Sequence, residues 1–216
     1  MDKNKIAIVI AGAALIYLLM KTNTVLAAPT KSAIVRGCDP LGCGNFGASR
    51  GTRSHSGIDY KALPGEAILS PITGKVTRYP FPYADDKRYT GIEIVNASYK
   101  VKMFYLSASV TIGTEVKAGQ QIGTAQNISD KHGSSMVNHI HFEIYDKNGI
   151  LLDPTTMIPV VSLNQNLLLK KGLYNSPEVQ ELQIRLKVTA DGDFGQLTEN
   201  ALVKAKGVKQ ITLKTF

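Results

Sequence analysis

The eight residues NHIHFEIY, Asn138 to Tyr145, combine side chains that bind metals with side chains that form a core. Successive side chains of a β-strand alternate between its two faces. One face would carry His139, His141, Glu143 and Tyr145, and the other would carry Ile140, Phe142 and Ile144. The polar face then holds a metal, performs acid–base chemistry, or forms an ordinary exposed sheet surface.

A second pair of metal-binding side chains stands in SHSGIDY, where His55 precedes Asp59 by four residues. Positions i and i+4 of an extended segment face the same way, and Gly57 permits close approach of the backbone. Together with one histidine of His-x-His they would supply three protein ligands and leave one position open to water, as in catalytic zinc sites. The remaining histidine would act as general base or orient the water.

Short strands separated by turns must position these residues. From Ala33 to about Pro159, apolar segments such as EAILSPITGKV, IEIVN, YKVKMFYLS and HIHFEIY alternate with turn residues. This pattern predicts a mainly β domain with an antiparallel sheet over residues 31–160.

Towards the C-terminus the sequence pattern changes from strands to helices. Ser176 is a good helix N-cap because Pro177 follows at the first helical position, and a second helix is expected from about Leu197 to Lys206. Residues 161–216 are therefore predicted to form a small all-α module.

The N-terminus contains an apolar run, Ile6 to Met20, between lysines. Fifteen residues suit a secretory signal but fall short of the roughly 20 of a comfortable membrane span. Residues 1–30 are expected to be an apolar helix that serves as a membrane anchor, or otherwise a cleaved signal; a buried helix of the folded domain is the third alternative. Either of the first two places the domain outside the cytoplasm, in a periplasm, on a cell surface or on a virion membrane.

The only cysteines, Cys38 and Cys43, stand in GCDPLGCG, where turn residues can bring them within disulfide range. We expect a disulfide-closed loop. The alternative is half of a zinc site, for which the nearest further ligand is His55.

The composition indicates what kind of partner the chain binds. The chain has 216 residues, 44% of them apolar, and a net charge of +8, which favours an anionic partner. No Gly-rich phosphate loop or aromatic–basic interleaving is present, so no nucleic acid partner is expected.

The blocks HSGIDY, GEAILSPITGKV, GTEVKAGQQIGTA, NHIHFEIY and LDPT resemble, in order, those of the lysostaphin-like zinc endopeptidases that cut bacterial cell-wall peptides. The resemblance runs from about Arg36 to Ile158. It implies a folded antiparallel sheet with a groove on one face. It also implies Zn²⁺ held by His55, Asp59 and His141, with His139 catalytic.

One position departs from that family. Its members carry a further catalytic histidine in a Tyr-x-His-Leu segment, where this chain has Tyr105 in KMFYLS. A tyrosine can donate a hydrogen bond to a developing oxyanion, but with an ordinary pKa of about 10 it is a poor general base. CDPLGCGNFGASRGTRSHSGIDY and VKMFYL more closely resemble the leukocyte cell-derived chemotaxin branch, which has this tyrosine, keeps the zinc ligands and is regarded as signalling.

The C-terminal SPEVQELQIRL and ADGDFG resemble a small three-helix peptidoglycan-binding module. An ordinary glycine-rich turn between helices is the alternative interpretation of DGDFG. Two further residues lie near the metal motif. His132 is expected in a solvent-exposed loop; the alternative is that it approaches the site and replaces the missing histidine. Glu143 either contacts a ligand from outside the metal site, or is simply exposed or paired with a basic neighbour.

The sequence thus predicts an exported zinc endopeptidase of peptidoglycan, acting in wall remodelling or in phage entry or lysis. Its partners would be peptidoglycan and, through the N-terminal segment, a membrane. The alternative is a weakly active or inactive zinc-stabilised binding or structural protein of an envelope or virion. Tyr105 is the residue that separates the two.

Overall fold

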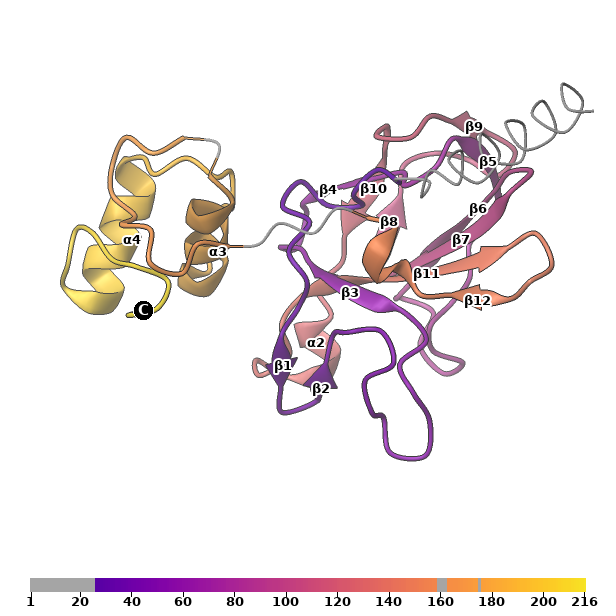
Figure 1. Ribbon diagram of the computed structural model, residues 1–216, viewed down its shortest axis with the longest axis horizontal. Coiled ribbons are helices and arrows are strands. Elements are labelled where there is room, and N and C mark those ends of the chain that lie inside the picture. The colour runs from indigo at the N-terminus through magenta and orange to yellow at the C-terminus, as the bar shows by residue number, and fades with distance from the viewer. Residues whose placement is uncertain (1–25, 159–162, 175) are drawn as a thin grey trace, which may run out of the picture.

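The computed structural model describes residues 26–158, 163–174 and 176–216 (Figure 1). The predicted apolar helix of segment 1–30 falls mainly on residues 1–25, which lie outside the described residues. Among the helices that are described, none is long and apolar enough to span a membrane.

The β part is built around one antiparallel sheet of seven strands. Six lie in the order β12 (Leu151–Leu152), β11 (His139–Asp146), β7 (Tyr99–Phe104), β6 (Gly91–Val95), β5 (Gly74–Arg78) and β9 (Glu115–Val116). The seventh, β3 (Ile58–Lys61), pairs with the first half of β11. The predicted mainly β, antiparallel fold is confirmed.

Smaller elements complete this part of the chain. A second sheet has the order β4 (Ala67–Leu69), β10 (Gln121–Ala125), β8 (Leu106–Ala108). A hairpin joins β1 (Cys38–Asp39) to β2 (Gly42–Cys43). The short helix α2 (Ser129–His132) precedes β11, and a 3₁₀ turn, η1 (Pro154–Thr156), follows β12.

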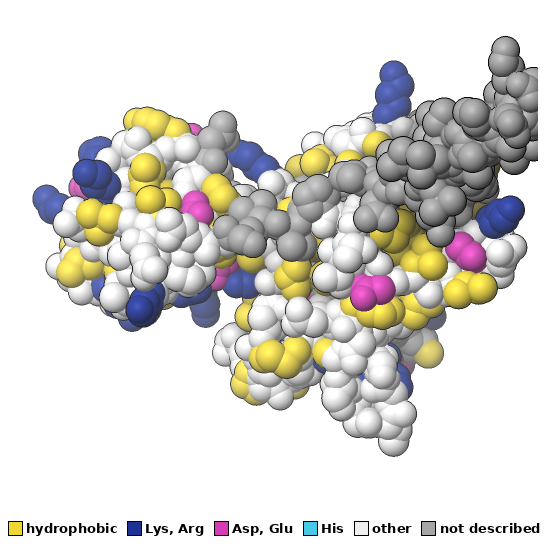
Figure 2. Space-filling model, viewed as in Figure 1, with side chains coloured by type: hydrophobic (Ala, Val, Ile, Leu, Met, Phe, Trp, Pro, Cys, Tyr) yellow, Lys and Arg dark blue, Asp and Glu magenta, His cyan; other side chains and the backbone are white. Residues whose placement is uncertain are grey.

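Two helices form the C-terminal part, α3 (Pro177–Leu186) and α4 (Gln196–Lys206). The Ser176 hydroxyl accepts a hydrogen bond from the Val179 N–H, and the left-handed Gly207 ends α4, so both predicted helices are confirmed. These helices pack on a hydrophobic cluster of their own, centred on Phe194, which shares no residue with the β core. Figure 2 shows Lys and Arg side chains scattered over this part of the surface.

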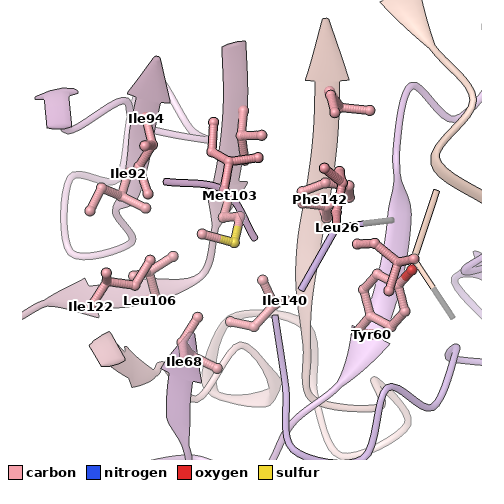
Figure 3. Close-up of a cluster of buried hydrophobic side chains, with 14 of the residues drawn as sticks. Leu26, Tyr60, Ile68, Ile92, Ile94, Met103, Leu106, Ile122, Ile140 and Phe142 are labelled. Carbon is pink, nitrogen blue, oxygen red and sulfur yellow. The ribbon is translucent and has the colours of Figure 1, made fainter. Parts of the chain in front are cut away.

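The apolar face of β11 lies in the main core. Ile140, Phe142 and Ile144 are fully buried, as their alternation predicts. Figure 3 shows the first two in one cluster with Met103 of β7 and Ile92 of β6. Burial of this face fixes the register of β11, because a one-residue slip would bring the histidines into the core.

A kink at Tyr105 separates β7 from β8. Tyr105 has a φ of 70°, in the left-handed region that costs a non-glycine residue about 1 kcal/mol. The N–H groups of Tyr105 and Leu106 both donate to the carbonyl of Thr90. Leu106 is fully buried while the Tyr105 side chain is only half-buried, so the kink turns the tyrosine out of the core.

Replacing Phe194 with alanine is expected to destabilise the helical part by about 3–5 kcal/mol, because it empties the centre of a small core. Hydrogen exchange should accelerate in α3 and α4 and stay unchanged in β11. Leu197→Ala is the matched control, since Leu197 is 80% exposed and its loss should change stability by less than about 0.5 kcal/mol. Equal acceleration in β11 would contradict the independence of the two cores.

Candidate metal centre

Two antiparallel strands bring the predicted ligands together. Asp59 of β3 lies directly opposite His141 of β11. His55 lies just before β3, outside the strand. The prediction that one extended segment from 55 to 59 is what turns His55 and Asp59 to the same side is therefore wrong. The chain instead crosses close over β11 at Gly57, where a Cβ atom would lie 2.4 Å from the Phe142 carbonyl oxygen and 2.7 Å from the His141 ring.

Three ligand atoms converge at this point. His55 Nε2 lies 2.9 Å from His141 Nδ1 and 3.2 Å from Asp59 Oδ1, and the last two atoms are 3.0 Å apart. Ligands about 2.0–2.1 Å from a tetrahedral zinc ion are separated by roughly 3.3 Å. The three residues therefore fit a small tetrahedral cation.

The outer nitrogens of both histidines face acceptors. His55 Nδ1 lies 2.9 Å from the Asn45 carbonyl oxygen, and His141 Nε2 lies 3.2 Å from Glu143 Oε1. Each of these nitrogens therefore carries the proton, and a neutral imidazole then turns its lone pair inward. Two lone pairs and a carboxylate oxygen would repel one another unless a cation lies between them.

The charge of the site favours that cation. Burial alone would lower the pKa of His141, but its hydrogen bonds to Asp59 and Glu143 raise it to about 9. The pKa of Asp59 is held well below its usual range, because hydrogen bonds from His141 and His55 outweigh the effect of burial. In the metal-free protein a proton on His141 thus takes the place of the positive charge.

Glu143 contacts the predicted ligand His141 and also pairs with a basic neighbour, because Lys102 Nζ lies 3.9 Å from its Oε2 atom, so the contact and the pairing left open for it both hold. Besides His141, it accepts hydrogen bonds from the hydroxyls of Ser56, at 2.7 Å, and Tyr145, at 2.6 Å. Burial would raise the pKa of Glu143, but these three partners lower it to about 2. Glu143 therefore stays ionised and orients the His141 ring.

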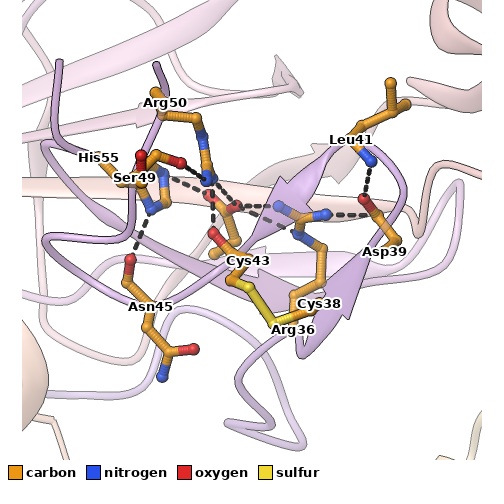
Figure 4. The surroundings of a disulfide bond; sticks show 10 residues. Arg36, Cys38, Asp39, Leu41, Cys43, Asn45, Ser49, Arg50 and His55 are labelled. Atoms are coloured by element: carbon orange, nitrogen blue, oxygen red, sulfur yellow. Dashed lines mark hydrogen bonds and ion pairs between the residues drawn. A yellow bond between two sulfur atoms is a disulfide. The ribbon is translucent and has the colours of Figure 1, made fainter. Parts of the chain in front are cut away.

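Arg36 holds the second oxygen of Asp59. Its Nε and Nη2 atoms donate to Asp59 Oδ2 at 3.2 and 3.0 Å, and its Nη1 atom donates to Asp39 (Figure 4). Oδ1 is left to face the two histidines. No motif in the sequence pointed to Arg36, which lies 23 residues before Asp59.

The predicted disulfide is present, so the alternative of half a zinc site at the cysteines is wrong. The Cys38–Cys43 bond, 1.99 Å long, closes the β1–β2 hairpin. Asp39, inside the hairpin, accepts a hydrogen bond from the Val137 N–H at 3.2 Å. The hairpin thereby holds the segment that leads into β11.

His139 lies beside the three-atom cluster but is not part of it. Its Nδ1 donates to the Val137 carbonyl at 2.6 Å, and its Nε2 lies 3.6 Å from Asp59 Oδ2. Burial lowers the pKa of His139 to about 4. The ring is therefore neutral at pH 7, with a bare Nε2 that can accept a proton.

Tyr105 packs edge-on against His139, with ring centroids 5.4 Å apart. Its hydroxyl lies 3.3 Å from that of Tyr83, whose oxygen lies 2.6 Å from His132 Nε2. His132 is half-buried in α2, so the expectation of an exposed loop histidine is wrong. Burial raises the pKa of both tyrosines. No pattern in the sequence singled out Tyr83.

The antiparallel sheet thus carries a His–Asp–His group that could hold a metal ion, beside a neutral histidine and a protonated tyrosine. The sequence profile of peptidase family M23 matches residues 53–154. Leukocyte cell-derived chemotaxin-2 of Bos taurus is 30% identical over 135 residues, which are 62% of this chain and 85% of that protein. The chain belongs to peptidase family M23.

Two solved structures are also similar to parts of the chain. The catalytic domain of the antimicrobial peptidase lysostaphin from Staphylococcus simulans is 24% identical, with a TM-score of 0.41; the match covers 53% of this chain and 86% of that domain. Helicobacter pylori Csd3 is also 24% identical, with a TM-score of 0.45 and 63% of this chain covered. The match spans 34% of the length of Csd3.

Gly57→Ala is expected to weaken metal binding by at least about 10-fold, because the added Cβ must push the His141 ring away. A competition titration of zinc against a chromophoric chelator measures the change. Gly37→Ala is the control, since nothing lies within 4 Å of a Cβ at Gly37. Equal affinity of the two variants would show that the close crossing does not position the ligand.

The two histidines of β11 should differ in their effect on metal content. After zinc loading and dialysis, the wild type and His139→Ala should both keep about one ion per chain, because the nitrogens of His139 lie outside the three-atom cluster. His141→Ala should lose most of it. Elemental analysis of both variants decides the assignment, and unchanged zinc in His141→Ala would refute it.

Proposed function

We propose that this chain is a zinc-dependent endopeptidase that hydrolyses peptide bonds of bacterial peptidoglycan. One observation carries the proposal: a buried, neutral His139 presents a bare Nε2 beside a three-ligand cluster. A histidine placed only for packing would not need a free nitrogen 3.6 Å from a ligand carboxylate.

His55, Asp59 and His141 would hold the ion. Zinc bound there supplies Lewis acidity, which polarises the scissile carbonyl and lets a water molecule ionise near neutral pH. Arg36 and Glu143 fix the ligand orientations from outside the cluster.

His139 and Tyr105 would perform the proton chemistry. Nε2 of His139 accepts the proton of the attacking water and later delivers it to the departing amine. The Tyr105 hydroxyl stays protonated, because burial raises its pKa, and it donates to the negative charge that develops on the carbonyl oxygen. Tyr105 thus stabilises charge and does not replace the expected histidine as a base.

The proposed substrate and location are supported by features outside the metal site. A net charge of +8 favours an anionic envelope, and the sequence of the C-terminal part resembles peptidoglycan-binding modules. With the apolar segment 1–30 as anchor or signal, the enzyme would act outside the cytoplasm, in wall remodelling or in phage entry or lysis.

A second function, in binding or structure without turnover, is favoured by one residue. Tyr105 stands where a second catalytic histidine is expected, and a tyrosine that stays protonated cannot act as a base. Zinc would then stabilise the fold of an envelope or virion protein that binds a ligand without cutting it. The chemotaxin-2 relative has a name that refers to no peptidase activity.

Zinc-loaded full-length protein should release new amino groups from purified peptidoglycan, and a chelator should stop the release. His139→Ala should reduce the rate by about 100-fold or more while keeping its zinc, because it removes only the proton acceptor. Tyr105→Phe should reduce the rate by about 100-fold, the usual effect of losing one oxyanion donor. Amino-group labelling over time measures each rate.

Tyr105→His distinguishes the two functions. No release by the wild type, together with release by Tyr105→His, would favour the binding protein. Release by the wild type that survives complete zinc removal would contradict the metal-dependent mechanism.

A further inference from the structure

Three polar side chains form a continuous hydrogen-bonded row that leads to His139. His132 of α2 contacts Tyr83 at 2.6 Å, and Tyr83 contacts Tyr105 at 3.3 Å. The ring of Tyr105 then meets His139 edge-on. The three residues of the row come from separate segments, 49 and 22 residues apart from Tyr83, and all are half-buried.

The row has a direction. The geometry makes the Tyr83 hydroxyl the donor and the Tyr105 oxygen the acceptor. A tyrosine hydroxyl has a single proton, so Tyr83 cannot also donate to His132. Its oxygen therefore accepts a hydrogen bond from Nε2 of His132, in the tautomer that carries its proton on that nitrogen, and the proton of Tyr105 remains available to a further partner.

The surroundings keep the row protonated. Burial raises the pKa of Tyr83 and Tyr105, so both hydroxyls carry their protons at neutral pH. The ammonium group of Lys131, 4.5 Å over the ring of Tyr83, lowers the pKa of Tyr83, but it also pairs with Asp86 at 3.3 Å, and the effect of burial is larger. A chain of hydrogen bonds in which each donor polarises the next strengthens the last donor.

The backbone at Tyr105 points to the same role. Its left-handed conformation costs about 1 kcal/mol, and strain of this kind is often found where a side chain must be aimed at a site. The kink turns Tyr105 away from the core and towards both Tyr83 and His139.

We propose that Tyr83 and His132 are positioning residues that orient the Tyr105 hydroxyl as a proton donor to the oxygen of the substrate carbonyl. The inference rests on the proposed peptidase function and deepens it. His132 donates from Nε2 to Tyr83, Tyr83 donates to Tyr105, and Tyr105 donates to the substrate. No proton needs to leave the row during the reaction.

Kinetics of the zinc-loaded full chain on cross-linked muropeptides tests the role. His132→Leu should lower kcat by about 10-fold to 100-fold with KM and zinc content unchanged, because it removes the first donor. His132→Gln should stay within a few-fold of the wild type, since its side-chain amide can donate from nearly the same place. Equal activity of His132→Leu and the wild type would overturn the proposal.

A Tyr105→Phe background provides the matched control. In that background His132→Leu should have no further effect on kcat, because the last donor of the row is already absent. An undiminished loss there would mean that His132 acts only on the stability of the fold, which also overturns the proposal.

Nitrogen NMR of ¹⁵N-histidine-labelled full chain tests the direction of the row without activity. His132 should be protonated at Nε2, and Tyr83→Phe should shift that resonance. A bare Nε2 with the proton on Nδ1 would overturn the proposal even in an active enzyme. A wild type without activity but with the Nε2 proton would refute the peptidase function and leave the direction of the row established.

Discussion

The convergence of His55 Nε2, Asp59 Oδ1 and His141 Nδ1 is the constraint on which the site depends. The atoms lie 2.9–3.2 Å apart, and the outer hydrogen bonds of both rings direct lone pairs inward. Such a cluster is stable only around positive charge, whether a proton or a metal ion. Much of the surrounding structure, from Arg36 on Asp59 to the bend at Gly57, serves to hold these three atoms together.

One strand links that cluster to the core. Because Ile140 and Phe142 are fully buried on one face of β11, His139 and His141 must lie on the other. The same hydrophobic burial that stabilises the sheet therefore sets the register of the chemistry. The disulfide hairpin extends this control, since Asp39 holds both Arg36 and the segment leading into β11.

Local patterns could be predicted from the sequence, and the family resemblance supplied the three residues of the cluster, His55, Asp59 and His141. The contacts that surround this cluster could not be predicted. Alternation in β11 and the cap at Ser176 depend on neighbouring residues, and both are confirmed. The pairing of Arg36 with Asp59, and of Tyr83 with His132, depends on where distant segments meet, 23 and 49 residues apart. The prediction that His132 is exposed is wrong for the same reason. Its partner Tyr83 lies 49 residues away, and the sequence around Tyr83 gives no sign of the contact.

His139 lies at the boundary of two electrostatically different halves. On one side are the ionised carboxylates of Asp59 and Glu143, which favour a cation. On the other are neutral hydroxyls that stay protonated because burial disfavours their anions. With a cation held by the carboxylate half, a carbonyl placed between the halves would meet positive charge from one side and a hydrogen-bond donor from the other. In the proposed peptidase mechanism, that arrangement would let a tyrosine occupy the position where a second histidine is expected, because the site would need a donor there and His139 would supply the base.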